Sequence, residues 1–138
     1  MKINVEETRT GRPCVWEEGG GRTRSGHAVL VTDSKGEPLK PLYVQGKGIR
    51  VCSKHALMPL VEGGYVIAVE YKGPQGLLEV YQAVLCEKSP GLELQLVQSV
   101  DGLQDPPQGI LPSFLYKAVS AAWRKARMYH CRSATYVP

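Results

Sequence analysis

Gly64-Tyr-Val-Ile-Ala-Val-Glu-Tyr71 is followed at once by Lys72-Gly-Pro-Gln-Gly76 and then by Leu77-Leu-Glu-Val-Tyr-Gln-Ala-Val-Leu85. The first and last of these segments are rich in β-branched and aromatic residues, which favour strands. The short segment between them contains two glycines and a proline, a composition typical of a turn. The sequence therefore predicts an antiparallel hairpin at the centre of the fold.

A second hairpin is predicted upstream of the first. His27–Asp33 has the pattern of a buried strand, and Ser34-Lys35-Gly36 follows it as a tight turn, so Pro38–Gln45 is expected to be the partner strand. Pro38 and Pro41 have no N–H to donate to a ladder, which predicts that this partner lies at a sheet edge.

Further short strands are predicted on both sides of the two hairpins. Leu92–Val100 alternates, with Leu92, Leu94, Leu96 and then Gln98 on one face. The other expected elements are strands at Lys2–Glu7 and Gly48–Cys52 and a turn of helix at Ser53–Leu60.

The pattern changes to a helical period near the C-terminus. Ser113 is predicted to be the N-cap of a helix in which Leu115, Ala118, Val119, Ala122 and Ala126 form one apolar stripe. The predicted fold is mainly β, a β-rich α+β class: an antiparallel sheet or small barrel of about five to seven strands closed by one C-terminal helix. One domain spans residues 1–138, with a β body at 1–100, a linker at 101–112 and a basic helix at 113–130.

Positive charge is concentrated in the last 33 residues. No Asp or Glu occurs from Pro106 to Pro138, whereas the first 105 residues hold 12 basic and 13 acidic groups, so the formal net charge of +4 belongs to the tail. A basic helix on a nearly neutral β body indicates an anionic partner. The tail also interleaves aromatic with basic residues from Trp123 to Arg132, which suits phosphate neutralisation and base stacking and favours nucleic acid.

Other features limit the class of protein. No apolar run approaches the roughly 20 residues that cross a bilayer, and Met1–Thr8 has no apolar core of a secretory signal. A cytoplasmic protein without a membrane partner is expected. Four cysteines in such a setting favour thiols or metal ligands over disulfides; they are Cys14, Cys52, Cys86 and Cys131.

One cysteine–histidine pair has a spacing that suits a metal ion. Cys52-Ser-Lys-His55 places two ligands on one tight turn, and Cys14 and His27 are the candidates for the third and fourth positions of a zinc site. The competing interpretation is that Cys52 is a small buried apolar residue at a strand end and that His55 caps the next turn.

Residues 9–26 are predicted to form a long loop with an unusual density of functional groups. The loop contains four arginines, two glutamates, Cys14, Trp16 and five glycines. Glycines 19–21 permit close approach of a ligand to the backbone, but no Gly-Lys-Ser/Thr follows as in a P-loop. A ligand site and a solvated loop with internal Arg–Glu pairs are both compatible with this composition.

The leading functional hypothesis is a non-enzymatic binding module for an anionic ligand, nucleic acid first, stabilised by zinc. Its predicted ligand-binding residues are Trp16, Arg22, Arg24, Lys117, Arg124, Lys125 and Arg127. The alternative is a small zinc enzyme with Glu17 or Glu18 as general base. A further alternative is an assembly subunit that uses the helix stripe of Leu115, Val119 and Ala122 against another chain.

Overall fold

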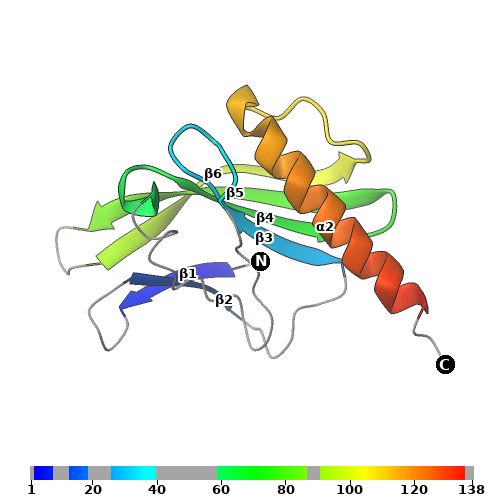
Figure 1. The fold of residues 1–138 in the computed structure, drawn as a ribbon, viewed down its shortest axis with the longest axis horizontal. Coiled ribbons are helices and arrows are strands. Elements are labelled where there is room, and N and C mark those ends of the chain that lie inside the picture. The colour runs from blue at the N-terminus through cyan, green and yellow to red at the C-terminus, as the bar shows by residue number, and fades with distance from the viewer. Residues whose placement is uncertain (1, 8–12, 19–25, 40–58, 87–90, 136–138) are drawn as a thin grey trace.

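The computed structural model describes residues 2–7, 13–18, 26–39, 59–86 and 91–135. Its centre is a four-stranded antiparallel sheet in the order β3-β4-β5-β6, in which every strand pairs with its neighbour along the described chain (Figure 1). The strands are β3 (His27–Val31), β4 (Tyr65–Tyr71), β5 (Gln75–Cys86) and β6 (Gly91–Gln104). A C-terminal helix packs against this sheet, so the predicted β-rich α+β fold is confirmed.

The helical segment begins with a single turn of 3-10 helix, η1 (Ser113–Leu115), and continues as α2 (Tyr116–Thr135). Its predicted apolar stripe is buried on the sheet, together with Trp123. The sheet contributes alternate residues to the same core, because successive side chains of a strand point to opposite faces. Burying each large side chain of this core contributes about 1.5–3 kcal/mol. The sheet residues of the core are Ala28, Ile67, Val69, Leu78, Val80 and Leu103.

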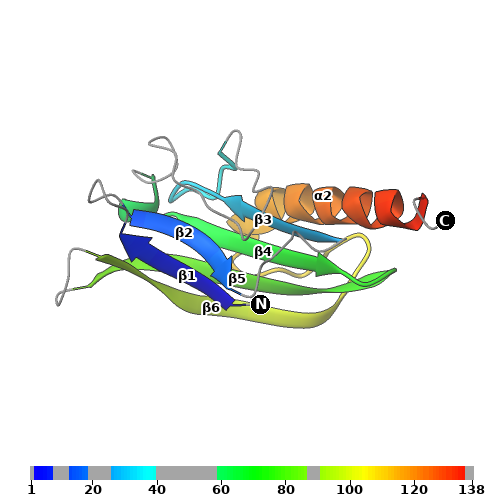
Figure 2. The ribbon, with the colours of Figure 1, turned by 90° about the horizontal axis from the view of Figure 1, so that it is seen from below.

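The opposite face of the sheet is also largely buried. Val31, Val66 and Ala68 are fully buried there, and Tyr81 and Ala83 lie on the same face of β5. A separate two-stranded ribbon of β1 (Lys2–Glu7) and β2 (Pro13–Glu18) lies on this side of the sheet, across from α2 (Figures 1 and 2). β1 runs beside β6 but does not share its ladder, so the two sheets remain distinct.

The β4–β5 hairpin is confirmed, and of the second predicted hairpin the described residues show the turn and the first contact of the returning segment. β4 and β5 pair as expected, and the second hairpin closes through the bridge between Thr32 and Pro38 and the hydrogen bond from the Leu39 N–H to the Val31 carbonyl. Residues 59–61 are helical, as expected for the end of Ser53–Leu60. The rest of Pro38–Gln45, the rest of Ser53–Leu60 and all of Gly48–Cys52 lie outside the described residues.

Three predicted details are wrong. β6 continues to Gln104, so the linker covers only residues 105–112. The N-cap of η1 is Pro112 without a side-chain hydrogen bond, and Ser113 is already helical. Gln98 faces the opposite way from Leu94 and Leu96, because a bulge at Val97 adds a residue to β6 between the pairs Val80–Gln98 and Tyr81–Leu96.

Candidate functional site

The exposed face of α2 carries the cations that the sequence singles out. Lys117 and Arg124 are seven residues apart, so they lie on one face of the helix and about 10.5 Å apart along its axis. Both are exposed, whereas the opposite side of the helix is packed on the sheet. Lys125 lies at the flank of this exposed face. We call Lys117, Arg124 and Lys125 the cationic face.

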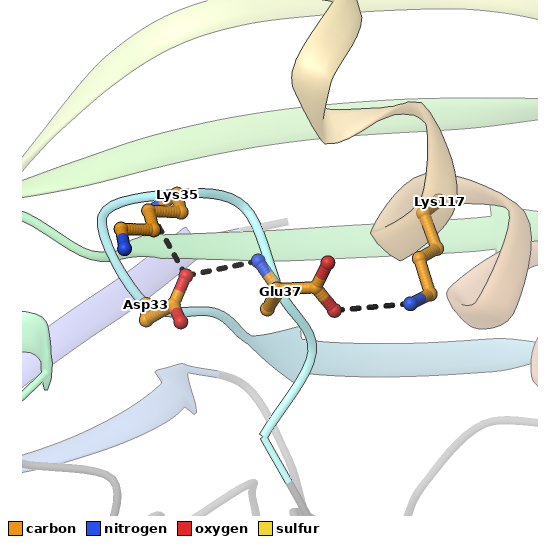
Figure 3. A network of polar contacts seen from close by, with 4 residues as sticks. All are labelled: Asp33, Lys35, Glu37 and Lys117. Carbon is orange, nitrogen blue, oxygen red and sulfur yellow. Dashed lines mark hydrogen bonds and ion pairs between the residues drawn. The ribbon is translucent and has the colours of Figure 1, made fainter.

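One residue of the cationic face, Lys117, forms an ion pair with an acidic residue of the turn that follows β3. Its Nζ lies 3.0 Å from Glu37 Oε2, with the two side chains 70% and 58% exposed (Figure 3). Glu37 is held in place by its own turn: Asp33 Oδ1 accepts hydrogen bonds from the backbone N–H groups of Lys35 and Glu37, each at 2.9 Å. The ion pair is therefore a solvated contact between a preformed turn and the first turn of α2.

Arg127 forms an ion pair with a less exposed acid than Lys117 does. Its guanidinium lies 2.7 Å from Asp105 Oδ2, and the aspartate side chain is only 19% exposed. The Asp105 N–H donates to the Pro74 carbonyl in the β4–β5 turn. Arg127 therefore joins α2 to the connection after β6, and this structural role separates it from the predicted ligand-binding set.

The sequence does not reveal either acid partner. Glu37 is 80 residues from Lys117 along the chain, and Asp105 lies in a segment whose composition indicates only a linker. No local pattern joins such distant residues. Together the two ion pairs bring acids of the body to two of the five tail cations, so the charge separation seen in the sequence is partly cancelled in space.

Trp123 does not take the exposed position that stacking on a base requires. Its side chain is 2% exposed, and its ring packs edge-to-face on Tyr71 with 5.2 Å between ring centroids. The prediction that Trp123 interleaves with the basic residues as a stacking surface is therefore wrong. The interaction stripe of Leu115, Val119 and Ala122 is likewise buried in the chain's own core, so it offers no face to another chain.

The predicted loop at residues 9–26 is wrong in its middle part. Pro13–Glu18 forms β2, which pairs with β1 so that Cys14 is opposite Glu6 and Trp16 is opposite Asn4. Glu17 and Glu18, the candidate general bases, are in the same strand, opposite Ile3 and Lys2. Arg22 and Arg24 lie outside the described residues.

His27 is the member of the predicted zinc set whose side chain the structure describes. It begins β3 and is 2% exposed. Since its neighbour Ala28 packs in the core under α2, His27 points to the opposite face, the side on which the ribbon bearing Cys14 lies (Figure 2). Cys52 and His55 lie outside the described residues. Within the described part of the chain, no group of three or more His, Cys, Asp or Glu residues is placed to hold a metal ion.

Comparison of the chain with protein-family models, with curated proteins and with solved structures found no match. Among the helices in the described residues, none combines the length and the apolar character needed to cross a membrane. The cationic face is a cluster of three positively charged residues on a regular element, with Lys117 and Arg124 exposed.

Proposed function

We propose that the protein is a non-enzymatic binding module for a polyanion, with nucleic acid as the ligand, and that the cationic face of α2 is its binding surface. The proposal rests on one observation: α2 turns Lys117 and Arg124 to solvent on a helix with no Asp or Glu in its 20 residues. A row of cations on a rigid helix attracts phosphates through Coulomb forces and counterion release.

The packing of α2 supports this choice of surface. The buried stripe from Leu115 to Ala126 holds this part of the helix on the sheet, so the backbone that carries the cations is already ordered before binding. Arg127 is excluded from the surface by Asp105. Lys117 forms a solvated ion pair with Glu37, and a phosphate can replace the exposed carboxylate as its partner.

The test is a titration of a fluorescent oligonucleotide with the full chain at several salt concentrations. The double variant Arg124→Ala/Lys125→Ala is expected to weaken binding at least tenfold at low salt. It should also lower the magnitude of the log–log salt slope by about 1.4–1.8, the contribution of two phosphate contacts. The matched control is Lys2→Ala/Lys72→Ala, which makes the same change of net charge at one lysine of the ribbon, on the side of the sheet across from α2, and at one lysine of the β4–β5 turn (Figure 2).

Equal weakening by the two double variants would show that only net charge matters and would overturn the assignment of the surface. Binding that neither variant changes would likewise overturn the assignment of the surface, whereas absence of binding at low salt would overturn the function itself. Far-UV circular dichroism of each variant shows whether the helix is retained.

A further inference from the structure

The segment that leads into α2 exposes apolar and aromatic side chains. Leu111, Phe114 and Tyr116 are 71%, 46% and 44% exposed. Among the side chains that the structure describes, Phe114 and Tyr116 are the two exposed aromatic ones. Exposed apolar side chains that are grouped in this way indicate a binding surface, whereas single scattered ones do not.

The ring of Phe114 is held in place although the residue is partly exposed. It packs edge-to-face with Tyr65 of β4, with 5.6 Å between ring centroids. It also lies against the turn after β3, where a Cβ built on Gly36 would be 2.8 Å from Phe114 Cδ2. A ring that is fixed before binding loses little conformational entropy when a ligand stacks on it.

Positive charge lies directly beside these rings. Tyr116 immediately precedes Lys117, and Phe114 lies one turn before it. Arg124 follows Tyr116 by eight residues, which is about 12 Å along the helix axis. Lys117 is paired with Glu37, and this exposed carboxylate can give way to a phosphate. The start of α2 therefore combines exposed rings with residues of the cationic face.

Rings and cations on one surface match the chemistry of a single strand of nucleic acid. Its bases can leave their neighbours and stack on side-chain rings while its phosphates contact the cations. The bases of a duplex are stacked on one another and present their edges in the grooves rather than their faces. A duplex would therefore gain from the cations alone, whereas a single strand would gain from the rings as well.

We infer that the ligand is a single strand of nucleic acid, whose bases stack on Phe114 and Tyr116 while Lys117 and Arg124 bind its phosphates. This inference rests on the proposed function and deepens it by naming the form of the ligand and the side chains that hold its bases. DNA and RNA strands share this chemistry, and separate titrations with each distinguish the two sources.

The test compares three probes of equal length with the full chain at one low salt concentration. The probes are a mixed-sequence single strand, the same strand with every base replaced by an abasic site, and the duplex. Stacking is worth roughly five- to hundredfold in affinity per base. The normal strand is therefore expected to bind at least about fivefold more tightly than the abasic strand.

Variants of the two rings locate the stacking surface. Phe114→Leu and Tyr116→Leu should each weaken binding of the normal strand about fivefold or more and leave the abasic strand and the duplex unchanged. Tyr116→Phe keeps the ring and should bind all three probes as the unchanged chain does. The matched control is Leu96→Ala, which removes an exposed apolar side chain of β6 and should change no affinity. Far-UV circular dichroism shows whether each variant keeps the helix.

Two outcomes would overturn the inference while leaving the proposed function intact. One is equal affinity for the normal and the abasic strand. The other is a pair of ring variants that leave binding of the normal strand unchanged, or that weaken all three probes alike. Absence of binding to all three probes would instead overturn the proposed function.

Discussion

The ring of Trp123 lies against the backbone of Gly76, at the start of β5, where the distance from a Cβ built on the glycine to Trp123 Cζ3 would be 2.7 Å and to Cη2 3.1 Å. The same Cβ would also lie next to the backbone carbonyl oxygen of Glu70 in β4. This contact holds α2 against the sheet, and the cationic face lies on the solvent side of the helix.

Gly76→Ala is expected to lower the free energy of unfolding by about 1–3 kcal/mol, because the added methyl group overpacks the contact with Trp123. Chemical denaturation measures the change, and near-UV circular dichroism shows loss of the ordered tryptophan environment. The control is Gly73→Ala, where φ is +93° and no atom lies within 4 Å of the new Cβ. That variant should lose about 1 kcal/mol through backbone strain and keep the tryptophan signal.

The two ion pairs of the tail are expected to differ in strength. Asp105 is 19% exposed, so we expect a coupling energy of about 1 kcal/mol or more with Arg127, whereas the solvated pair of Lys117 and Glu37 should give about 0.5 kcal/mol or less. Double-mutant cycles with Asp105→Asn/Arg127→Met and Glu37→Gln/Lys117→Met measure both values. Equal coupling in the two cycles would contradict the structural role assigned to Arg127.

Glu37→Gln is expected to strengthen polyanion binding by roughly two- to fivefold at low salt, since it frees Lys117 and removes a negative charge beside the cationic face. Fluorescence anisotropy measures the change. Glu62→Gln makes the same change of charge at another exposed position, and its effect should be smaller. A gain of the same size in both variants would assign the effect to net charge.

The zinc hypothesis predicts about one zinc per chain in protein purified without chelator, and a lower melting temperature after the metal is removed. His27→Ala is expected to abolish the bound zinc, because His27 is the buried histidine on the ribbon side of the sheet. Elemental analysis measures the zinc content, thermal denaturation measures the melting temperature, and thiol titration counts the free cysteines. Metal-free protein with four titratable thiols would exclude a native site made of Cys14, Cys52, His55 and His27.

Local patterns were sufficient for most of the sheet and for the helix. Val66, Ile67 and Val69 in β4 and the alternation of β6 favour extended backbone through side-chain sterics that act within a few residues. β2 was missed because Pro13–Glu18 lies between segments rich in Gly and Arg, and it is stabilised by pairing with β1 rather than by its own propensity.

The sequence by itself determined the β4–β5 hairpin, the helical stripe and the concentration of positive charge after residue 105, because propensity, periodicity and composition are properties of neighbouring residues. Only the tertiary structure decided that Trp123 is buried against Gly76, that Arg127 forms an ion pair with Asp105 and that Lys117 forms one with Glu37. Those contacts join residues far apart in the chain, and they form only where the packing of α2 on the sheet brings their elements together.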